Sequence, residues 1–513
     1  MDDQIAEAHL LYNQDPGFLF SETEEPIEPE HVDGMVDEIA DAGIDVFFIN
    51  SNMWCTNHPS EAWEPWWEGY QTWAEHHPPL DTNGMAKTLH WHHPRHPKRY
   101  QMIEQMERLA ANGCDYLQRG LERCLERGVK PGVSIRMNDQ HLNGWPESPY
   151  FSEFYRNHPE LRFETGELTG LAGLNYEYEP VRNHFLALIE EIAEDYPTAV
   201  LELDFLRHPP FVPDGRSAPG ASTMTDFLRS VADICRHNSV SLMPRVPATP
   251  GGARELGLDI SEWTEADLID GIIVGTALRV DWQIPVGIVR SAVGDLPLFI
   301  SIDKVADDPP GLPWRLLPDN ESLLRGVAGT YAEQDIDGLY FFNFFGPREE
   351  PVNPTEPSFH EVDRLRSPER LRGTEKIYLL TSGENLDARS HSPVQLPLRL
   401  DSGLPRSLRF TILSESTAMN YRLLIVFDRQ IDPGALTIRV NEQPVGDAKQ
   451  QMEYDRPGHR GGSSGTAPAV AFQVPADAIH GGENRITLQK NGNSEAMVIL
   501  VELHVEQPEE TTG

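Results

Sequence analysis

The sequence predicts an α/β protein that consists of a (β/α)8 TIM barrel followed by an antiparallel β-sandwich. From residue 6 to about residue 346, short apolar runs alternate with helical patterns, which is typical of repeated βα units and a parallel sheet. Eight such runs are present, and eight strands with intervening helices fit a closed barrel better than an open doubly wound sheet. After about residue 370, alternating strands separated by Pro- and Gly-rich turns indicate a β-sandwich.

Each barrel strand is predicted from an apolar run, and each helix from an amphipathic period. The strands are expected at residues 8–13, 45–50, 131–138, 199–205, 240–245, 271–276, 297–302 and 338–343. The helices are expected at residues 31–43, 99–128, 180–195, 221–237, 262–268, 284–293 and 320–333. No G-x-G-x-x-G motif follows the first strand, so a dinucleotide cofactor is not expected.

These patterns also predict the domain boundaries. A chain of 513 residues is too long for one ordinary core. We expect a catalytic barrel over residues 1–350 with a long Trp- and His-rich insertion at about 51–98, a Pro-containing linker over 351–370, and a sandwich over 371–513. Within the sandwich, strands are expected at 421–427, 436–440 and 497–503, and the Gly- and Ser-rich stretch 451–467 is expected to be a mobile loop.

The composition excludes several classes of partner. Acidic residues number 81 against 42 basic residues, giving a formal charge of −39, which argues against binding to nucleic acid or to an anionic membrane. Nearly all the basic residues are arginines, and an acidic protein poor in lysine suits a salt-rich cytoplasm. Without a long apolar run or a signal peptide, the chain as given is expected to be cytoplasmic and not to span a membrane. The four scattered cysteines predict no disulfide framework.

The segment from Val200 to Pro209 contains the most informative polar residues. Glu202 and Asp204 lie two positions apart on a predicted buried strand, so both carboxylates share one face, and Arg207 and His208 follow at its C-terminal end. Barrels of this kind keep their chemistry at the C-terminal ends of the strands. We therefore expect Asp204 to be the reactive acid and Glu202 a deeper, structural acid paired with an arginine. The alternative is that both acids are satisfied core residues without a catalytic role.

Two arginines on neighbouring predicted strands, Arg136 and Arg245, are the expected partners of these acids. For glycoside hydrolysis a second carboxylate is needed. The candidates are Asp281, Asp303, and Glu177 or Glu179. Asp281 is chosen as the acid because it lies in a loop beside a tryptophan, where a raised pKa is plausible.

Further polar and aromatic residues near the strand ends are expected to contact a substrate. Arg136 and Asn138 share a face of the third strand, and Asp139 and His141 follow them. Flat aromatic rings suit stacking against sugar rings. The complete set of expected substrate contacts is Arg136, Asn138, Asp139, His141, Glu202, Arg207, His208, Arg245, Asp303, Asn343, Trp54 and Trp91.

The histidines of the insertion raise the question of a metal. His90, His92 and His93 lie on a Pro-broken stretch without the ordered spacing typical of zinc ligands, so neither a metal nor another cofactor is expected. A metal-dependent alternative would require at least two of His90, His92, His93 and His141 to converge with Asp204 on one ion.

The segments 174–182 and 201–209 resemble the glycoside-hydrolase-like family 10 barrels and, more loosely, barrels of the retaining α-glycosidase type. In that family a Pro-x-Val-Arg-like segment opens the helix before a strand that ends in Leu-Asp; here the segment reads Glu179-Pro180-Val181-Arg182. The resemblance implies that Asp204 is the nucleophile. The segment 480–488 is similar to the final turn and strand of galactose-binding-like sandwiches, which are often carbohydrate-binding or structural.

Together these features predict a glycoside hydrolase that acts on an oligo- or polysaccharide through paired carboxylates. The alternatives are a non-hydrolytic carbohydrate-binding protein and a metal-dependent sugar isomerase or lyase on the same barrel. The sequence leaves open the sugar, the linkage, endo or exo action, retention or inversion, and the oligomeric state.

Overall fold

In the computed structural model, the barrel predicted from the sequence is present. The structure describes residues 5, 7–21, 25–80, 95–139, 148, 151–163, 173–277, 280–303, 305–306, 315–316, 320–344, 359–381, 393–415, 418–446, 450–456, 465–492 and 495–508. Eight parallel strands close in the order β1-β10-β7-β6-β5-β4-β3-β2. They are β1 (Leu10–Gln14), β2 (Val46–Asn50), β3 (Lys130–Arg136), β4 (Val200–Asp204), β5 (Ser241–Pro247), β6 (Ile272–Gly275), β7 (Leu298–Asp303) and β10 (Gly338–Phe342).

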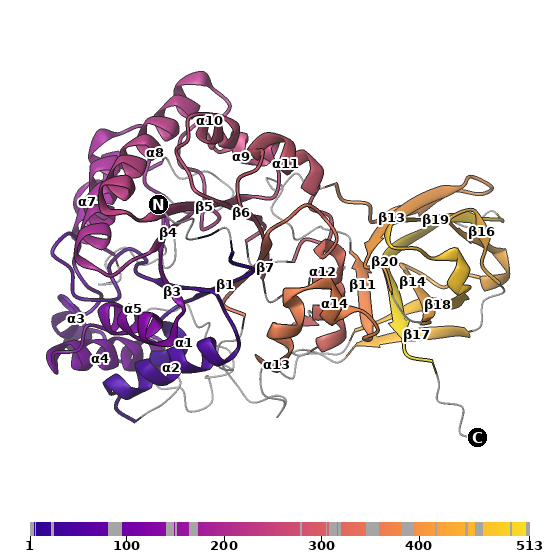
Figure 1. Cartoon of the computed structure of the whole chain (residues 1–513), viewed down its shortest axis with the longest axis horizontal. Coiled ribbons are helices and arrows are strands. Elements are labelled where there is room, and N and C mark those ends of the chain that lie inside the picture. Colours follow the sequence, from indigo (N-terminus) through magenta and orange to yellow (C-terminus); the bar gives the residue numbers. More distant parts are fainter. Residues whose placement is uncertain are drawn as a thin grey trace.

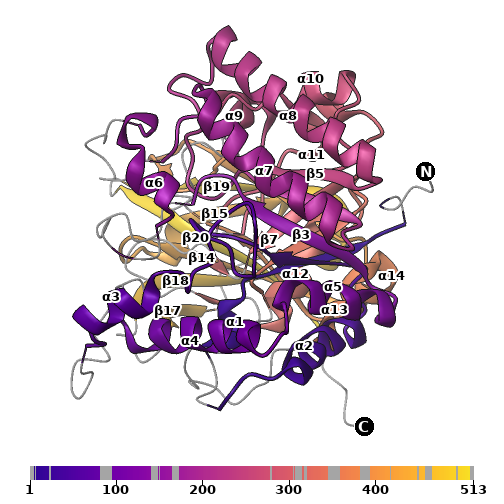
Figure 2. The same ribbon diagram turned by 90° about the vertical axis from the view of Figure 1, so that its left-hand side faces the viewer.

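Helices surround this barrel, because their apolar stripes pack on the outward-facing side chains of the strands. The principal ones are α2 (Pro29–Asp41), α5 (Tyr116–Arg127), α7 (Glu179–Asp195), α8 (Ala218–Asn238), α10 (Ile260–Glu265), α11 (Val286–Val293) and α12 (Glu321–Tyr331). Figures 1 and 2 show α7 and α8 covering one side, and α2 and α5 covering another.

The helix predicted at 99–128 is in fact two helices. The first, α4 (Pro97–Ala111), ends before Gly113, whose φ of +83° breaks the helical path. Asp115 then caps α5, because its carboxylate accepts hydrogen bonds from the N–H groups of Leu117 and Gln118. Six short α-helices of the described residues were not predicted: α1 (Gly17–Phe20), α3 (Tyr70–His76), α6 (Glu153–Asn157), α9 (Pro250–Glu255), α13 (Phe359–Val362) and α14 (Pro368–Leu371). Of these, α3 lies with α4 beside α1 (Gly17–Phe20) at one corner of the barrel (Figure 2).

The sandwich contains two antiparallel sheets. One has the order β11-β20-β14-β18-β17, with β12 pairing β20, and the other has the order β13-β19-β15-β16. The first sheet contains β11 (Lys376–Leu380), β12 (Leu398–Leu400), β14 (Asn420–Phe427), β17 (Gln450–Arg456), β18 (Gly465–Val474) and β20 (Ala496–Glu506). The second contains β13 (Arg406–Ile412), β15 (Leu436–Val440), β16 (Gln443–Pro444) and β19 (Gly482–Lys490). The expectation of a loop over 451–467 was wrong for residues 451–456, which belong to β17, and for residues 465–467, which belong to β18; the residues between them lie outside the described part of the chain.

The sandwich is packed directly against the barrel. Figure 1 shows it beside α12 and α14 (Pro368–Leu371). Two glycines of α12 allow this approach: a Cβ at Gly326 would overlap the carbonyl oxygen of Ile377, and one at Gly329 would lie 2.7 Å from the Tyr378 hydroxyl. On the six-stranded sheet, Leu423 and Ile425 face the interior of the sandwich, whereas the alternate residues Leu424 and Val426 belong to the same continuous core as the barrel.

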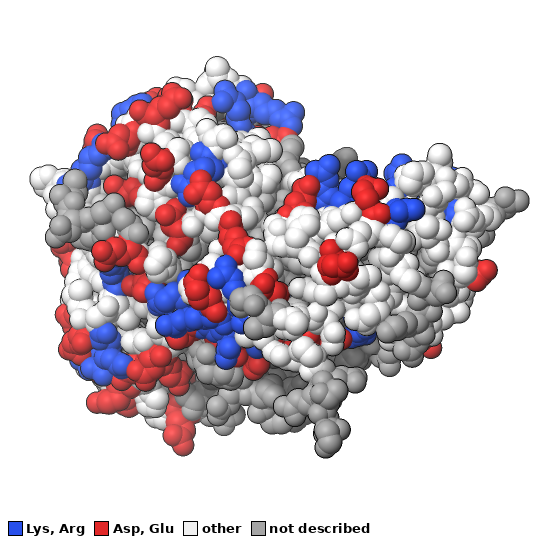
Figure 3. Space-filling view, turned by 45° about the vertical axis from the view of Figure 1, so that its right-hand side comes forward, with Lys and Arg blue, Asp and Glu red and all other residues white. Residues whose placement is uncertain are grey.

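The surface is strongly charged, but acids and bases are interspersed on the face drawn in Figure 3. On α2 and α5, for example, Arg119 pairs with Asp33 at 2.5 Å, and Arg123 with Asp37 at 2.8 Å. None of the helices in the described part of the chain has the length and hydrophobicity needed to cross a lipid bilayer.

Candidate active site at the barrel mouth

Side chains that point into the barrel change from apolar to charged along its axis. Near the N-terminal ends of the strands the interior contains a tight apolar cluster that includes Leu11, Val46, Phe48, Val200, Met243, Ile273 and Phe299. On β10 this cluster continues towards the mouth, because Tyr340 and Phe342 are paired with Ser301 and Asp303 of β7. Because side chains alternate along a strand, the next inward residues are two positions further on. On β1, β4, β5 and β7 these are Asn13, Glu202, Arg245 and Ser301. Asp15, Asp204 and Asp303 follow at the C-terminal mouth, so polar groups converge where barrel chemistry takes place.

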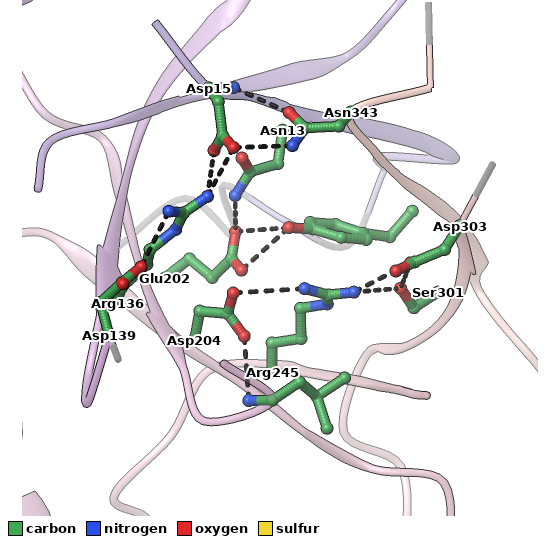
Figure 4. Close-up of polar contacts among 12 residues, drawn as sticks. Asn13, Asp15, Arg136, Asp139, Glu202, Asp204, Arg245, Ser301, Asp303 and Asn343 are labelled. Carbon is green, nitrogen blue, oxygen red and sulfur yellow. Dashed lines mark hydrogen bonds and ion pairs between the residues drawn. The ribbon is translucent and has the colours of Figure 1, made fainter. Parts of the chain in front are cut away.

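Arg245 joins two carboxylates in this layer (Figure 4). Its Nη1 donates to Oδ2 of Asp204 at 3.2 Å, and its Nη2 donates to Oδ1 of Asp303 at 2.9 Å. The hydroxyl of Ser301 accepts from Nη2 at 3.1 Å and donates to Asp303 at 3.0 Å. Arg245 and Asp204 have 0% side-chain exposure, and Asp303 has 1%. Burial opposes the charge on Arg245, but Asp303 and Asp204 outweigh it and raise the pKa of the guanidinium above its usual value.

Asp204 is held at both oxygens. Besides Arg245 on Oδ2, the backbone N–H of Leu206 donates to Oδ1 at 2.9 Å. Because each carboxylate oxygen has two lone pairs, these contacts fix the orientation of the group and leave electron pairs on both oxygens.

Glu202 lies one layer deeper and is held by neutral groups. The Tyr340 hydroxyl lies 2.9 Å from both carboxylate oxygens, and Nδ2 of Asn13 donates to Oε2 at 2.9 Å. Burial and the nearby charge of Asp204 raise the pKa of Glu202 to about 8. The expectation that Glu202 is the arginine-paired acid was therefore wrong: the direct ion pair to Arg245 is made by Asp204, one layer nearer the mouth.

A second charged group contains Asp15, which was not predicted. Arg136 Nη2 donates to both oxygens of Asp15 at 2.5 Å, and its Nη1 donates to Asp139 at 2.9 Å. Asn343, at the end of β10, accepts from the backbone N–H of Asp15 and donates to its Oδ2, both at 2.8 Å. Burial opposes ionisation of Asp15, but Arg136 and Arg207 outweigh it, so its pKa lies below the usual value. Its signal in the sequence was the polar run Asn13-Gln14-Asp15 at the end of the first strand.

The two groups are neighbours in the barrel. Arg136 and Asp204 are paired residues of the adjacent strands β3 and β4, and the charge of Asp204 contributes to raising the pKa of Arg136 above its usual value, together with Asp15 and Asp139 and against burial. Arg207 is 6% exposed, and its guanidinium lies 5.7 Å from the centre of the Phe342 ring, which Arg245 approaches to 4.4 Å. His208 follows Arg207 with a φ of +52°. The structure thus brings together Arg136, Asp139, Glu202, Asp204, Arg207, Arg245, Asp303 and Asn343.

Two expected substrate contacts have structural partners instead. Asn138 is fully buried, and its amide donates to the carbonyl groups of Leu174 and Pro210 and accepts from the N–H of Leu174. The ring of Trp54 is 4% exposed and packs 4.2 Å from that of Tyr155 and 5.3 Å from that of Phe151, centre to centre. Both expectations were therefore wrong in this structure, because Asn138 holds two loops together and Trp54 fills the core of the insertion.

Asp281 is buried and contacts its own loop and α12. Oδ1 of Asp281 accepts from the N–H of Gln283 at 2.8 Å, and its carbonyl accepts from the hydroxyl of Tyr331 on α12 at 2.6 Å. His90, Trp91, His92, His93 and His141 lie outside the described residues. Among the residues that the structure describes, no cluster of histidine, cysteine and carboxylate side chains could hold a metal ion.

Comparison with known proteins assigns no family. No family model matches the chain, and no curated protein matches it either. The resemblance to glycoside-hydrolase-like family 10 proteins therefore has no support from a family model.

Solved structures that resemble the chain include a glucanotransferase, an α-galactosidase and an α-amylase. A cycloisomaltooligosaccharide glucanotransferase from Paenibacillus sp. is 9% identical, with a TM-score of 0.34, and the match covers 98% of this chain and 58% of that one. A GH36 α-galactosidase from Geobacillus stearothermophilus is 12% identical, with a TM-score of 0.37 and coverages of 97% and 55%. An α-amylase from Lactobacillus plantarum is 11% identical, with a TM-score of 0.40 and coverages of 92% and 100%.

The chain thus spans little more than half the length of the first two of these structures. At such identities and TM-scores the likeness does not identify a reaction.

Proposed function

We propose that the barrel hydrolyses glycosidic bonds of an oligo- or polysaccharide, with Asp204 as the nucleophile. The observation that carries this proposal is the pair of carboxylates, Asp204 and Asp303, that share the guanidinium of Arg245 at the mouth. Two ion pairs to one guanidinium hold these two carboxylates close together at one place in the mouth.

The electrostatics of this pair suit its proposed roles. Arg245 and the N–H of Leu206 hold the carboxylate of Asp204 in one orientation, and attack on an anomeric carbon requires a positioned carboxylate oxygen. Glycoside cleavage passes through a transition state with oxocarbenium character. A second anion at Asp303 stabilises the positive charge that develops there. Glu202, with its raised pKa, is proposed as the structural acid beneath Asp204.

The general acid is assigned to Asp281 from the sequence, since its loop adjoins the end of β6. The role of Asp281 can be tested apart from that of Asp204, because a general acid is needed only when the leaving group is poor. Asp281→Asn is expected to lose activity on an oligosaccharide and to retain most of it on an aryl glycoside with an acidic phenol as leaving group. Equal loss on both substrates would move the role away from Asp281.

The experiment for Asp204 compares wild type with Asp204→Asn on a panel of aryl glycosides and oligosaccharides. We expect a loss of about 10³-fold or more in kcat on both kinds of substrate, with the circular dichroism spectrum unchanged. Asp226→Asn is the matched control, since Asp226 is an exposed acid of α8 that pairs with Arg229. Unchanged turnover in Asp204→Asn would remove this residue from the chemistry.

A non-hydrolytic carbohydrate-binding protein is the second candidate, and the burial of the cluster favours it. Asp204 has 0% side-chain exposure and already has partners on both oxygens, as a structural ion pair would. This candidate predicts that no panel member is cleaved, and that sugars raise the Tm of wild type and of Asp204→Asn equally.

A further inference from the structure

A cavity lies away from the mouth, between the barrel and the sandwich. It has a volume of about 610 Å³, within the range of small-molecule sites. On the barrel side it is lined by the turn before α11, the start of α11, and part of α12; on the sandwich side by β11, β13, β19 and residues 393 and 395. We call it the seam cavity.

Apolar side chains are unusually exposed at this place. Ile288 lines the cavity and is 62% exposed, and Val394, between the lining residues Pro393 and Gln395, is 44% exposed. Among the described residues only six large hydrophobic side chains are exposed, and two of them are these. Trp282, which also lines the cavity, has a buried indole N–H without an acceptor in the described structure. Exposed apolar surface at a cavity that is also lined by amide side chains indicates a ligand with apolar faces and polar edges.

The polar groups of the seam cavity are neutral overall. Gln283, Gln334 and Gln395 supply amides, and the charged lining residues are Arg409 and Glu483, which pair at 3.3 Å. On a chain with a formal charge of −39, a charge-balanced site selects against ions and in favour of a neutral polar ligand.

Two glutamines have different roles at this site: Gln395 orients the side chain of Gln283, and Gln283 offers donors to a ligand. The amide nitrogen of Gln395 donates to the side-chain oxygen of Gln283 at 2.8 Å, which fixes the Gln283 side chain. The nitrogen of Gln283 has no acceptor in the part of the chain that the structure describes, so its two N–H groups remain available for hydroxyl oxygens.

A peptide ligand is disfavoured by the same glutamine. Strand β13 is at the edge of its sheet, where a peptide could add as a further strand. However, Gln395 accepts from the backbone N–H of Arg409 at 2.7 Å and donates to its carbonyl at 2.9 Å, so the backbone groups at the middle of this edge are occupied.

We infer that the seam cavity binds a neutral oligosaccharide, whose sugar rings have apolar C–H faces and hydroxyl-bearing edges. The apolar faces would lie against Ile288, and the hydroxyl groups would meet Gln283 and Gln334. This inference goes beyond the proposed function and does not require the mouth to be catalytic. It assigns to the chain a carbohydrate site that is separate from Asp204.

The test uses the full chain carrying Asp204→Asn, so that turnover does not consume the probes. Maltoheptaose, cellohexaose and xylohexaose are titrated by calorimetry and by saturation-transfer NMR. At least one is expected to bind, and Ile288→Asp or Gln283→Ala is expected to weaken that binding at least tenfold. Leu125→Asp is the matched control, because Leu125 is an exposed leucine of α5, 56% exposed, and it should leave the Kd unchanged.

Three outcomes would overturn the inference: none of the three probes binds, both cavity variants bind as tightly as their parent, or Leu125→Asp weakens binding as much as they do. Sedimentation of the parent and of Ile288→Asp adds a fourth, since a dimer that dissociates only in the variant would make the cavity a contact between two copies. These binding and sedimentation measurements do not depend on catalysis at Asp204. The proposal for the seam cavity can therefore be contradicted without contradicting the proposed function, and the reverse is also true.

Discussion

Arg245 compensates two buried carboxylates at once, so the stability of the mouth depends on it. Arg245→Met keeps the aliphatic stem but leaves Asp204 and Asp303 buried without this cation, and we expect a loss of about 3–5 kcal/mol in the free energy of unfolding. Urea denaturation at neutral pH measures it. Arg229→Met breaks an exposed pair, with side-chain exposures of 47% and 68%, and should cost less than about 1 kcal/mol. Equal losses in unfolding free energy for Arg245→Met and Arg229→Met would show that the buried ion pairs stabilise the protein no more than an exposed pair does.

Glu202 should make stability depend on pH in the opposite sense from an ordinary carboxylate. Its pKa is raised to about 8 in the folded protein, so between about pH 4.5 and 8 the folded state binds a proton that the unfolded state has released. The contribution of Glu202 to the free energy of unfolding is therefore fully present below about pH 4.5 and is lost as the pH rises towards 8. Glu202→Gln removes the dependence, and the buried Oδ1 of Asn13, which has no donor in the described structure, could then accept from the new amide.

The measurement is the difference in unfolding free energy between Glu202→Gln and wild type, taken from pH 5 to pH 9. It should shift in favour of the variant by up to about 1.4 kcal/mol per pH unit between pH 5 and 8. A constant difference over this range would mean that Glu202 is ionised throughout.

At this scale the sequence predicted which residues meet, but not how they pair. The period-two pattern of a strand placed Glu202 and Asp204 on one face, and the barrel brought Arg136, Arg245 and Asp303 to the same layer. The partner of each acid depends on the stagger of neighbouring strands, which a strand pattern does not contain. Asn138 shows the same limit: its two carbonyl acceptors come from Leu174 and Pro210, far away in the chain.

Among the elements, the insertion after β2 packs against α7 through the ring of His184. The ring of His184 is stacked between Trp63 at 4.1 Å and Phe154 at 4.0 Å, and burial lowers its pKa to about 3. Because His184 is protonated more readily in the unfolded chain than in the folded one, acid favours unfolding. The contribution of His184 to stability is therefore complete above about pH 6.5 and falls as the pH decreases below that value.

His184→Phe should therefore flatten the decline of Tm between pH 6.5 and 4, while keeping an aromatic ring in the stack. His237→Phe, at the exposed end of α8, is the control and should follow the wild-type profile. A variant at position 184 that loses Tm as steeply as wild type would assign the acid sensitivity to other groups. His58, also buried with a lowered pKa, is the next one to test.

The elements that were predicted correctly are those with a strong repeat. All eight strands of the barrel appeared, since each is a run of buried apolar residues. The helix over 99–128 was predicted as one because its amphipathic period continues through the break, and only the positive φ of Gly113 separates α4 from α5. Short helices such as α9 contain fewer than two full turns, so they carry too little periodicity to be recognised.

For the whole molecule, the seam between barrel and sandwich leaves no room for a side chain at Gly326 of α12. Gly326→Ala would drive a methyl group into the carbonyl of Ile377 on β11, and we expect a loss of about 1–3 kcal/mol in unfolding free energy. Gly34→Ala in α2 is the matched control, because a Cβ there meets nothing within 4 Å, and it should stabilise by up to about 1 kcal/mol. If both variants were equally stable in urea, the close approach would not be a constraint.

The shared core limits which fragments of this protein can fold alone and which can be recombined with other modules. Leu424, Val426 and Leu500 of the sandwich lie in one continuous apolar core with the barrel helices, so each part presents to the other a surface that water would otherwise cover. A gene fragment that encoded the barrel alone would expose that surface and yield an aggregating product. Shuffling of the sandwich onto another catalytic module would meet the same obstacle. The two architectures are therefore expected to persist together as one heritable unit.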